Sequence, residues 1–397
     1  MDRRLALHGG TPVRSRMLPY GRQWIDDADV EAVTRVLRSD WLTTGPAVDA
    51  FERAFAATTD TTHAVAVSNG TAALHTMMHV LGVQPGDEVI VPSLTFAATS
   101  NCVLYQGGTP RFVDVDPGTL LIDPSAVADF ITARTRAIVA VDYAGQPADY
   151  HVLRSIAAQH GLSLVADACH ALGGNDAGRP VGSLADITAF SLHPVKHITA
   201  GEGGVVTTDH PDLASRARRF RNHGITMDHR ARQRAGAWFY EMVELGYNYR
   251  LTDIQCALAT SQLAKLESWV CRRRHIAREY DEQLPTRTGL QPLEVRDGAY
   301  HAYHLYVVQL MEDAWRIGRD EVFAALRAEG IGVNVHYTPV HLHPYYRDRL
   351  STDRGMCPVA EAAYDRILSL PIFPHMTDAD VTDVLTACEK VFAALRA

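Results

Sequence analysis

Seven short apolar runs recur along the first half of the chain, separated by segments of helical or turn character. They are HAVAV from His63, EVIV from Glu88, RFVDV from Arg111, AIVAV from Ala137, LSLVA from Leu162, ITAFSL from Ile187 and GVVTT from Gly204. Runs of this length, rich in valine, isoleucine and alanine, are typical of strands buried on both faces. The pattern predicts an α/β fold in which a largely parallel sheet lies between helices.

Helical periodicity appears before and between these runs. The segment DDADVEAVTRVLRS, from Asp26, has acidic residues able to cap a helix and spaces four apolar residues along one face: Val30, Val33, Val36 and Leu37. The segment PADYHVLRSIAAQHG separates the fourth and fifth runs and supplies the crossover helix that parallel strands need. Both segments are predicted to be helices.

The pattern of apolar and polar residues changes after about residue 250. We expect a long charged helix from Thr252 to Gln283, a strand in YHLYVVQL, a helix from Arg319 to Glu329, a strand in IGVNVHY and a terminal helix from Asp378. This order predicts a smaller α+β unit. The interpretation is a large domain of residues 1–255, followed by a bridging helix and a small C-terminal domain in residues 256–397.

Composition narrows the class of protein. The 397 residues carry a formal net charge of −8 and a pI near 6.2, which argues against nucleic acid or an anionic membrane as the main partner. The six cysteines are scattered, without the spacing of a zinc site or disulfide framework. No signal-peptide core or membrane span is evident, so we expect a cytoplasmic location.

A small-residue turn follows the first predicted strand. In SNGTAAL, from Ser68, Gly70 permits close approach of a ligand, and Thr71 adds a hydroxyl at the start of a helix. Backbone N–H groups at such a position bind phosphate. The alternative is an ordinary strand-to-helix turn, since the pattern is neither a Walker nor a dinucleotide motif.

A carboxylate follows the fifth predicted strand. VADACHALGG places Asp167 at the carboxyl end of a buried strand, where α/β sheets present ligand groups, with His170 three residues later. The alternative roles are capping of the next turn by Asp167 and packing within that turn by His170.

A lone lysine follows the sixth predicted strand. In AFSLHPVKHITAGEGG, no charged residue directly precedes Lys196, and burial would lower its pKa, as suits an amine that attacks a carbonyl. The alternative is an ion pair with a carboxylate such as Glu202. A phosphate cradle, a carboxylate and such a lysine at one sheet edge together suit pyridoxal phosphate, which needs an anchor, an anion beside its ring nitrogen and an amine.

Seven motifs in order resemble the DegT/DnrJ/StrS-type sugar aminotransferases, which are fold-type I pyridoxal-phosphate enzymes. They are SNGTAAL, PSLTFAATSNCVLYQGGTPRFVDVD, DACHALGG, FSLHPVKHITAGEGG, GYNYRLTDIQCAL, VHYTPVHLHPYY and LSLPIFPHMTDADV, and the resemblance runs from about residue 15 to the C-terminus. It implies a large domain with a seven-stranded, mostly parallel sheet and a smaller C-terminal α+β domain.

The same resemblance assigns roles around the cofactor. Lys196 matches the Schiff-base lysine, Asp167 the partner of the pyridine nitrogen, Phe96 the aromatic ring that stacks on the cofactor and His170 a side chain near its ring. The phosphate-binding positions match Gly70, Thr71, the Ala72 backbone and Ser191, with Asn248 contributed by the neighbouring subunit. A homodimer with shared active sites is therefore expected.

The resemblance also implies the reaction. Related dehydratases that use pyridoxamine phosphate carry histidine in place of the lysine, so Lys196 favours an aminotransferase. We expect L-glutamate to donate an amino group, by a ping-pong exchange through pyridoxamine phosphate, to a keto group of a nucleotide-linked deoxy sugar. The motif HPVKHITAGEGG is more similar to the 4-aminotransferases acting on UDP-4-keto-6-deoxy sugars, on the way to pseudaminic acid.

Positions that match substrate contacts are spread along the chain. They are Tyr20, in an N-terminal segment of residues 1–40 that contributes to the substrate site, then Thr43, His336 and Tyr337. Arg250, or the arginines at 230, 232 and 234, would offset the diphosphate charge, unless they form a solvated surface. No ligand spacing supports a metal, so none is expected.

Two other functions stay open from the sequence, and a third is disfavoured. A keto-cyclitol aminotransferase of an aminoglycoside-type pathway shares the GGTPVR start, and a non-catalytic pyridoxal-phosphate-binding regulator would share the fold. A nicotinamide dehydrogenase is disfavoured, because no Gly-x-Gly-x-x-Gly follows an early strand.

Overall fold

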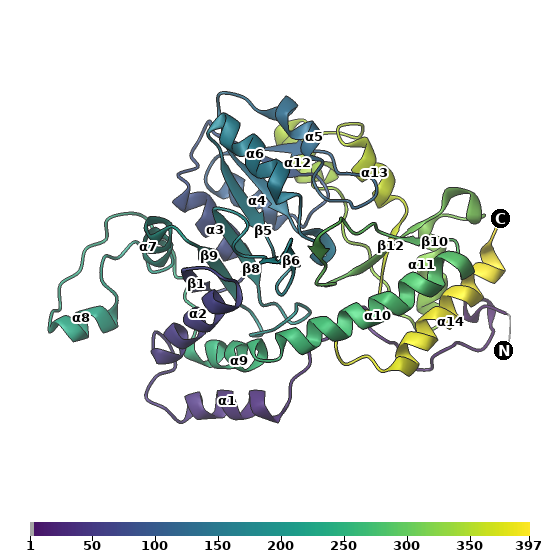
Figure 1. Cartoon of the computed structure of the whole chain (residues 1–397), viewed down its shortest axis with the longest axis horizontal. Helices are drawn as coiled ribbons and strands as arrows, with labels where there is room; N and C mark the ends of the chain where they lie inside the picture. Colours follow the sequence, from purple (N-terminus) through teal and green to yellow (C-terminus); the bar gives the residue numbers. More distant parts are fainter. Residues whose placement is uncertain (1–3) are drawn as a thin grey trace.

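A computed structural model describes residues 4–397 and brings all seven apolar runs into one sheet (Figure 1). The strands are β1 (His63–Val67), β2 (Glu88–Pro92), β3 (Thr109–Val113), β4 (Thr135–Val141), β5 (Ser163–Asp167), β8 (Ile187–Ser191) and β9 (Gly204–Thr208), in the order β1-β9-β8-β5-β4-β2-β3. Only β9 runs antiparallel to its neighbours in this sheet. The predicted largely parallel sheet is confirmed.

Helices cover both faces of this sheet. The helices of the described residues are α1 (Asp27–Leu37), α2 (Pro46–Thr58), α3 (Gly70–Val80), α4 (Ala98–Tyr105), α5 (Pro124–Val127), α6 (Tyr150–His160), α7 (Pro211–Phe220), α8 (His229–Ala235), α9 (Asp253–Leu263), α10 (Leu266–Arg287), α11 (Arg319–Ala328), α12 (Pro344–Leu350), α13 (Pro358–Tyr364) and α14 (Asp378–Leu395), of which only some contact this sheet. Side chains of α3, α4 and α7 pack on one face, and those of α2, α6 and α9 on the other.

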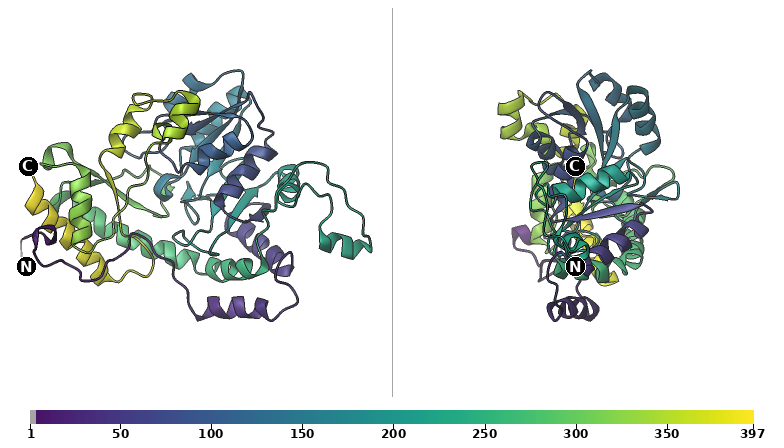
Figure 2. Two further views of the ribbon diagram at one scale, coloured as in Figure 1. Left: turned by 180° about the vertical axis from the view of Figure 1, so that it is seen from behind. Right: turned by 90° about the vertical axis from the view of Figure 1, so that its left-hand side faces the viewer.

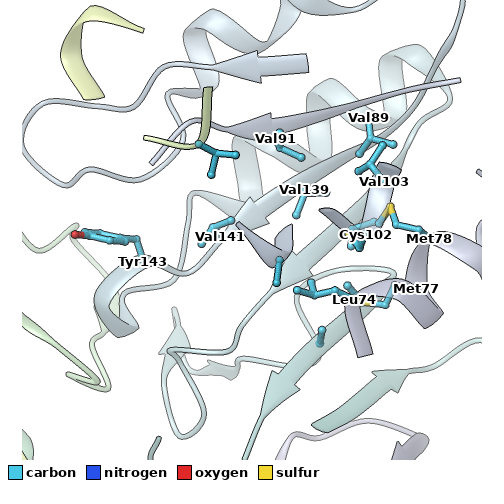
Figure 3. Packing of buried hydrophobic residues seen from close by; sticks show 14 of the residues in the cluster. Leu74, Met77, Met78, Val89, Val91, Cys102, Val103, Val139, Val141 and Tyr143 are labelled. Carbon is cyan, nitrogen blue, oxygen red and sulfur yellow. The ribbon is translucent and has the colours of Figure 1, made fainter. Parts of the chain in front are cut away.

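Alternation along each strand divides the core between these two layers. Val89 and Val91 of β2 face α3 and α4, as Figure 3 shows, whereas Ile90 between them joins the opposite cluster. Successive strand side chains point to opposite faces. Strands that are apolar at every position therefore bury both faces, and their ends are the edges left to polar groups.

The predicted N-terminal helix is α1, and its capping is as expected. Asp26 and Asp29 form a reciprocal capping box at its start. Its predicted apolar face is only partly correct, because Val30 and Leu37 are each 56% exposed. The buried side instead holds Asp29, whose carboxylate binds Lys265 and Gln262, so polar contacts decide how α1 docks.

The C-terminal part forms its own core around a three-stranded antiparallel sheet. Its strands are β10 (Leu290–Pro292), β12 (Tyr306–Leu310) and β13 (Ile367–Leu370), covered by α10, α11 and α14. Leu5 and Leu18 from the N-terminal segment also pack into this core. A short sheet of β6 (Asn175–Asp176), β7 (Arg179–Pro180) and β11 (Ala299–Tyr300) joins the two parts, and the boundary at residue 255 stays a prediction.

Two predicted elements differ in the structure. The long helix from Thr252 is two helices, because the chain turns at Ala264 and Lys265 so that α9 packs on α1 and α2 while α10 continues to the C-terminal core. The segment IGVNVHY forms no strand in the described chain. It makes only isolated bridges, Ile331 to Leu18 of the irregular N-terminal segment and Asn334 to Ser369 of β13, so it pairs with each neighbour at a single position.

Residues 225–248 form an arm that carries α8 away from the rest of the molecule, as Figure 1 and the left view of Figure 2 show. Within residues 4–397, no helix combines the length and apolar character required to cross a bilayer.

Candidate active site

A cavity of about 650 Å³ opens at the edge of the sheet where β1, β5 and β8 end. It is lined by eleven of the predicted site residues: Tyr20, Gly70, Thr71, Ala72, Phe96, Asp167, His170, Ser191, Lys196, His336 and Tyr337. Thr43, Asn248 and Arg250 are absent from its described lining. Most of the positions chosen from the sequence thus converge on one site.

The amino end of α3 forms one corner of the cavity. The Asn69 side chain caps the helix by accepting a 2.8 Å hydrogen bond from the Ala72 N–H. A Cβ on Gly70 would lie 2.9 Å from the Ser191 Cβ, so glycine lets the helix start approach the end of β8. The result brings helix N–H groups and two hydroxyls, from Thr71 and Ser191, to one corner, which is suited to an anion.

Asp167 ends β5 with its carboxylate oriented by two donors. The Thr99 hydroxyl donates to Oδ2 at 2.7 Å, and the Cys169 N–H donates to Oδ1 at 3.2 Å. The residue is only 6% exposed, so these bonds offset part of the cost of burying a charge. An oriented carboxylate at this place can face a cationic ring nitrogen.

Lys196 differs from the two other lysines of the chain. Lys265 pairs with Asp29 at 2.9 Å and Lys390 with Glu329 at 2.9 Å. Lys196 forms no ion pair with any carboxylate whose side chain the structure describes, and the alternative pairing with Glu202 is therefore wrong. Its Nζ instead lies 3.5 Å from Nε2 of a histidine, His304.

Burial sets the protonation of this lysine. It lowers the pKa of the Lys196 ammonium, and the nearby Cys169 thiol and Asp167 carboxylate oppose that effect. A lower pKa means that a larger fraction of the side chain is neutral amine at any given pH. The amine is thereby better prepared to attack a carbonyl carbon.

Two buried histidines stand side by side over the cavity. The rings of His170 and His304 are 4.4 Å apart, and His170 Nε2 lies 3.0 Å from the Tyr337 hydroxyl. The Nδ1 atoms of both are buried and have no hydrogen-bond partner in the described part of the chain. Burial lowers the pKa of each well below its usual value, so both are neutral.

The wall opposite the strand ends is largely aromatic. The Tyr20 and His336 rings are 5.1 Å apart, and the Phe96 and Tyr337 rings 5.7 Å apart. His336 is held from behind, with Nδ1 2.8 Å from the Ser369 hydroxyl, and burial lowers its pKa to about 4. Phe96 is 57% exposed, so its ring face is free to meet a flat ligand.

Three predicted residues lie elsewhere in the same chain. Thr43 bridges to Thr252, and Asn248 is exposed where it bridges to Asn222. Arg250 donates to the Asn222 side chain at 2.8 Å and shares a separate hollow of about 90 Å³ with Arg230. These residues do not reach the main cavity of their own subunit.

Two of the three arginines considered beside Arg250 have local partners. Arg230 pairs with Asp49 at 2.7 Å, and Arg232 lies over the Tyr240 ring. Arg234 is exposed on α8.

The donor set fits pyridoxal phosphate. The corner that a Cβ at Gly70 would fill suits a phosphate, Asp167 suits the ring nitrogen, and Lys196 is an amine without a carboxylate partner. Among residues 4–397, no group of three or more histidine, cysteine or acidic side chains is arranged to hold a metal ion.

The sequence reasoning missed His304. It lies in YHLYVVQL, which predicts only a strand, and β12 begins two residues later. A histidine just before an apolar strand was the available signal.

Comparison with known proteins shows close similarity over the whole length. The model of the DegT/DnrJ/EryC1/StrS aminotransferase family matches residues 23–389. The spore coat polysaccharide biosynthesis protein SpsC of Bacillus subtilis is 40% identical over 380 residues, 95% of this chain and 98% of that protein.

Solved structures agree. The putative sugar aminotransferase Spr1654 of Streptococcus pneumoniae, in its PMP form, matches with a TM-score of 0.90 and 31% identity, over 95% of this chain and 99% of that one. Helicobacter pylori PseC, an aminotransferase of pseudoaminic acid biosynthesis, matches with a TM-score of 0.90 and 30% identity, over 96% and 100%. DesI, solved in the presence of its TDP-sugar product, matches with a TM-score of 0.86 and 34% identity, over 97% and 95%.

Proposed function

The chain belongs to the DegT/DnrJ/EryC1/StrS aminotransferase family and is a fold-type I, pyridoxal-phosphate-dependent sugar aminotransferase; from this premise, we propose its substrates and site residues. The amino donor is L-glutamate, and the acceptor is the C4 keto group of a nucleotide-linked deoxy sugar, with UDP as the nucleotide. The pseudoaminic acid pathway named for PseC supports an amino-sugar product, the polysaccharide pathway named for SpsC supports a sugar substrate, and the TDP-sugar product of DesI supports a nucleotide-linked acceptor.

One observation carries the site assignment: Lys196, Asp167 and the amino end of α3 line a single cavity. When bound, pyridoxal phosphate supplies an electron sink and cycles through its pyridoxamine form. Lys196 is the residue that bonds to the cofactor and, once released, carries a proton between the cofactor carbon and the substrate carbon. Asp167 keeps the ring nitrogen protonated.

The remaining side chains of the site bind the cofactor and orient it. Thr71, Ser191 and the α3 backbone at Gly70 and Ala72 bind the phosphate, and the Ala72 N–H has to be shared with the Asn69 side chain that now caps it. The exposed face of Phe96 stacks on the ring. His170, held by the Tyr337 hydroxyl, packs beside it.

The sugar nucleotide enters along the aromatic wall. Tyr20, His336 and Tyr337 contact the sugar, and their mutual ring contacts keep that wall rigid. Thr43 contacts the sugar nucleotide and Arg250 its diphosphate, both from outside the main cavity. Charge-assisted bonds from Arg250 would offset the diphosphate charge.

A second copy of the chain completes each site. The arm of residues 225–248 exposes a row of apolar side chains: Trp238, Phe239, Tyr240, Met242, Val243, Leu245 and Tyr247. A contiguous apolar patch of this kind is a protein-binding surface. Asn248 lies at the end of the arm and is exposed, so it is available to the phosphate site of a partner subunit.

The decisive experiment follows the visible absorption of the bound cofactor. We expect wild type to be yellow, L-glutamate to bleach the band, and Lys196→Ala to lack it. The matched controls are Lys265→Arg and Lys390→Arg, which should retain the band because their lysines pair with carboxylates. A yellow Lys196→Ala protein would contradict the assignment, and a wild-type band indifferent to L-glutamate would contradict the donor.

A panel of nucleotide-linked keto sugars then tests the acceptor. L-glutamate first converts the cofactor to its pyridoxamine form. Incubation of this form of the enzyme with a UDP-4-keto-6-deoxy sugar should then restore the yellow band and yield a 4-amino sugar. Restoration by a 3-keto sugar or by a keto-cyclitol alone would overturn the C4 assignment.

Mixing variants tests the shared site. Lys196→Ala and Asn248→Asp chains should each be inactive, and randomly paired hybrids should regain about a quarter of wild-type activity, because half of the dimers are hybrids with one complete site. No recovery after subunit exchange would place Asn248 in its own subunit's site, whereas an active Asn248→Asp chain would place Asn248 outside the site.

A further inference from the structure

His304 lies beside the amine of Lys196, and the proposed reaction does not yet use it. Its Nε2 is 3.5 Å from Lys196 Nζ, and its side chain is 5% exposed. We propose that His304 is a positioning residue: its neutral Nε2 accepts a hydrogen bond from the Lys196 amine whenever that amine is not bonded to the cofactor. The inference rests on the role proposed for Lys196.

The surroundings of His304 keep its ring neutral. The titratable groups that face it are Lys196, His170, His197 and Arg273, and none of them is a carboxylate. Burial lowers the pKa of His304 well below its usual value, and the cationic side chains of Lys196 and Arg273 act in the same direction. A neutral imidazole with Nδ1–H presents Nε2 as an acceptor.

A neutral hydrogen-bond acceptor can orient the Lys196 amine without raising its pKa, whereas a carboxylate in the same place would raise it. An adjacent carboxylate stabilises the ammonium and raises its pKa, as expected where Lys265 meets Asp26 and Asp29. An imidazole nitrogen can fix the direction of the amine without adding an opposite charge. Lys196 is then both aimed and available as a base and a nucleophile.

The backbone holds His304 on both sides. The fully buried Arg273 donates from Nη1 to the carbonyl oxygens of Tyr303, at 3.0 Å, and His304, at 3.3 Å. The Leu305 N–H donates to the Ala144 carbonyl oxygen at 3.0 Å. A ring fixed in this way restricts a flexible lysine side chain whose free rotation would slow its attack.

The test is capture of pyridoxal 5′-phosphate by the cofactor-free, full-length chain, followed by the growth of visible absorbance. In this step the lysine nitrogen bonds to the aldehyde carbon, and the aldehyde oxygen leaves as water. His304→Gln places an amide near the Nε2 position, whereas His304→Asn is too short to reach. We expect the glutamine variant to remain within about threefold of wild type and the asparagine variant to be about tenfold slower.

Controls separate positioning from damage to the fold. His301→Gln alters another buried histidine of the same segment, whose Nδ1 accepts from the Tyr303 N–H, and should capture at the wild-type rate. All variants should retain the affinity for pyridoxamine 5′-phosphate, which cannot bond to lysine. If His304→Asn does not fold, His304→Leu removes the acceptor while filling the space and should be equally slow.

The pH profile gives a readout that a purely structural role would not move. Capture requires neutral amine, so its rate rises as pH passes upward through the Lys196 pKa. His304→Glu supplies a carboxylate and should move the midpoint of that rise to higher pH by about one to three units.

Several results would overturn the proposal. They are wild-type capture by His304→Asn or His304→Leu, slow capture by His301→Gln, loss of pyridoxamine phosphate affinity in step with the capture rate, and an unmoved midpoint in His304→Glu. Failure of the wild type to capture the cofactor would instead overturn the role of Lys196, and with it the proposed function.

Discussion

The two walls of the active-site cavity are built in different ways. One wall is made of strand ends and the helix start that follows β1, and it carries Thr71, Asp167, Ser191 and the adjacent Lys196. The facing wall comes from irregular segments and carries Tyr20, His304, His336 and Tyr337. The first wall is positioned by the hydrogen bonds of the sheet, whereas the second depends on single side chains behind it.

Those supports are few and buried. Arg273 binds the carbonyl oxygens of Tyr303 and His304, the Tyr143 hydroxyl donates to the His336 carbonyl oxygen, and Ser369 bonds to the His336 ring. The comparison teaches that chemistry at the strand ends should be sensitive to local substitutions. The facing wall should be sensitive to substitutions that do not touch the cavity.

The largest effect is expected on the strand-end wall. Asp167→Asn removes the negative charge opposite the ring nitrogen while preserving shape, so turnover with L-glutamate should fall at least about 100-fold. Thr99→Val removes only the donor to Oδ2 and should have a much smaller effect. Single-turnover absorbance measures both, and an Asp167→Asn enzyme within a few-fold of wild type would contradict the role of the carboxylate.

The facing wall should be most sensitive to loss of Arg273, the buried side chain that holds its backbone. Arg273→Met leaves three buried carbonyl oxygens, those of Tyr303, His304 and Ile372, without this donor and should lower the free energy of unfolding by about 3–5 kcal/mol. The control is Arg272→Met, since Arg272 is partly exposed and binds near the start of α14. Urea unfolding measures the free energy of unfolding of both variants. Equal losses would show that the buried hydrogen bonds of Arg273 contribute no more to stability than the contacts of Arg272.

The histidines behind that wall make stability depend on pH. Burial lowers the pKa of His301 to about 3, so below pH 6.5 the unfolded chain binds a proton that the folded chain does not. Stability should therefore fall as pH falls, with His301 contributing about 2 kcal/mol of that loss at pH 5. His301→Gln should flatten the decline in urea titrations at pH 7 and 5; an unchanged slope would rule out this contribution.

The smallest effect is expected at Phe96, where the two walls meet. Phe96→Leu keeps an apolar side chain but loses the flat ring, and affinity for pyridoxamine 5′-phosphate should fall about two- to tenfold. Tyr105→Phe, also at the cavity but retaining its ring, is the control. Fluorescence titration measures both affinities, and an unaffected Phe96→Leu protein would remove Phe96 from the ring site.

The same difference explains what could be predicted from the sequence. Buried parallel strands leave a clear apolar signature, and their carboxyl ends meet at one edge, so the strand pattern predicts that Thr71, Asp167 and Lys196 lie together, as they do in the cavity. Site residues that directly follow such strands can therefore be predicted from the local sequence.

The facing wall carries no comparable signal. IGVNVHY looks like a strand, yet its position depends on Leu18 and Ser369, which are remote in sequence. His304 could not be assigned beside Lys196, because their contact joins residues 108 positions apart through segments held by Arg273. Likewise, the buried side of α1 is set by Asp29 and Lys265 rather than by its valines.

The cap that Asn69 places on α3 bears on how strongly the phosphate corner can bind. The Asn69 side chain already accepts from the Ala72 N–H, so one donor of the helix start is paired within the protein itself. A phosphate bound there would share this donor with Asn69 or displace it, so the net gain in binding free energy from the Ala72 N–H is only the difference between two hydrogen bonds.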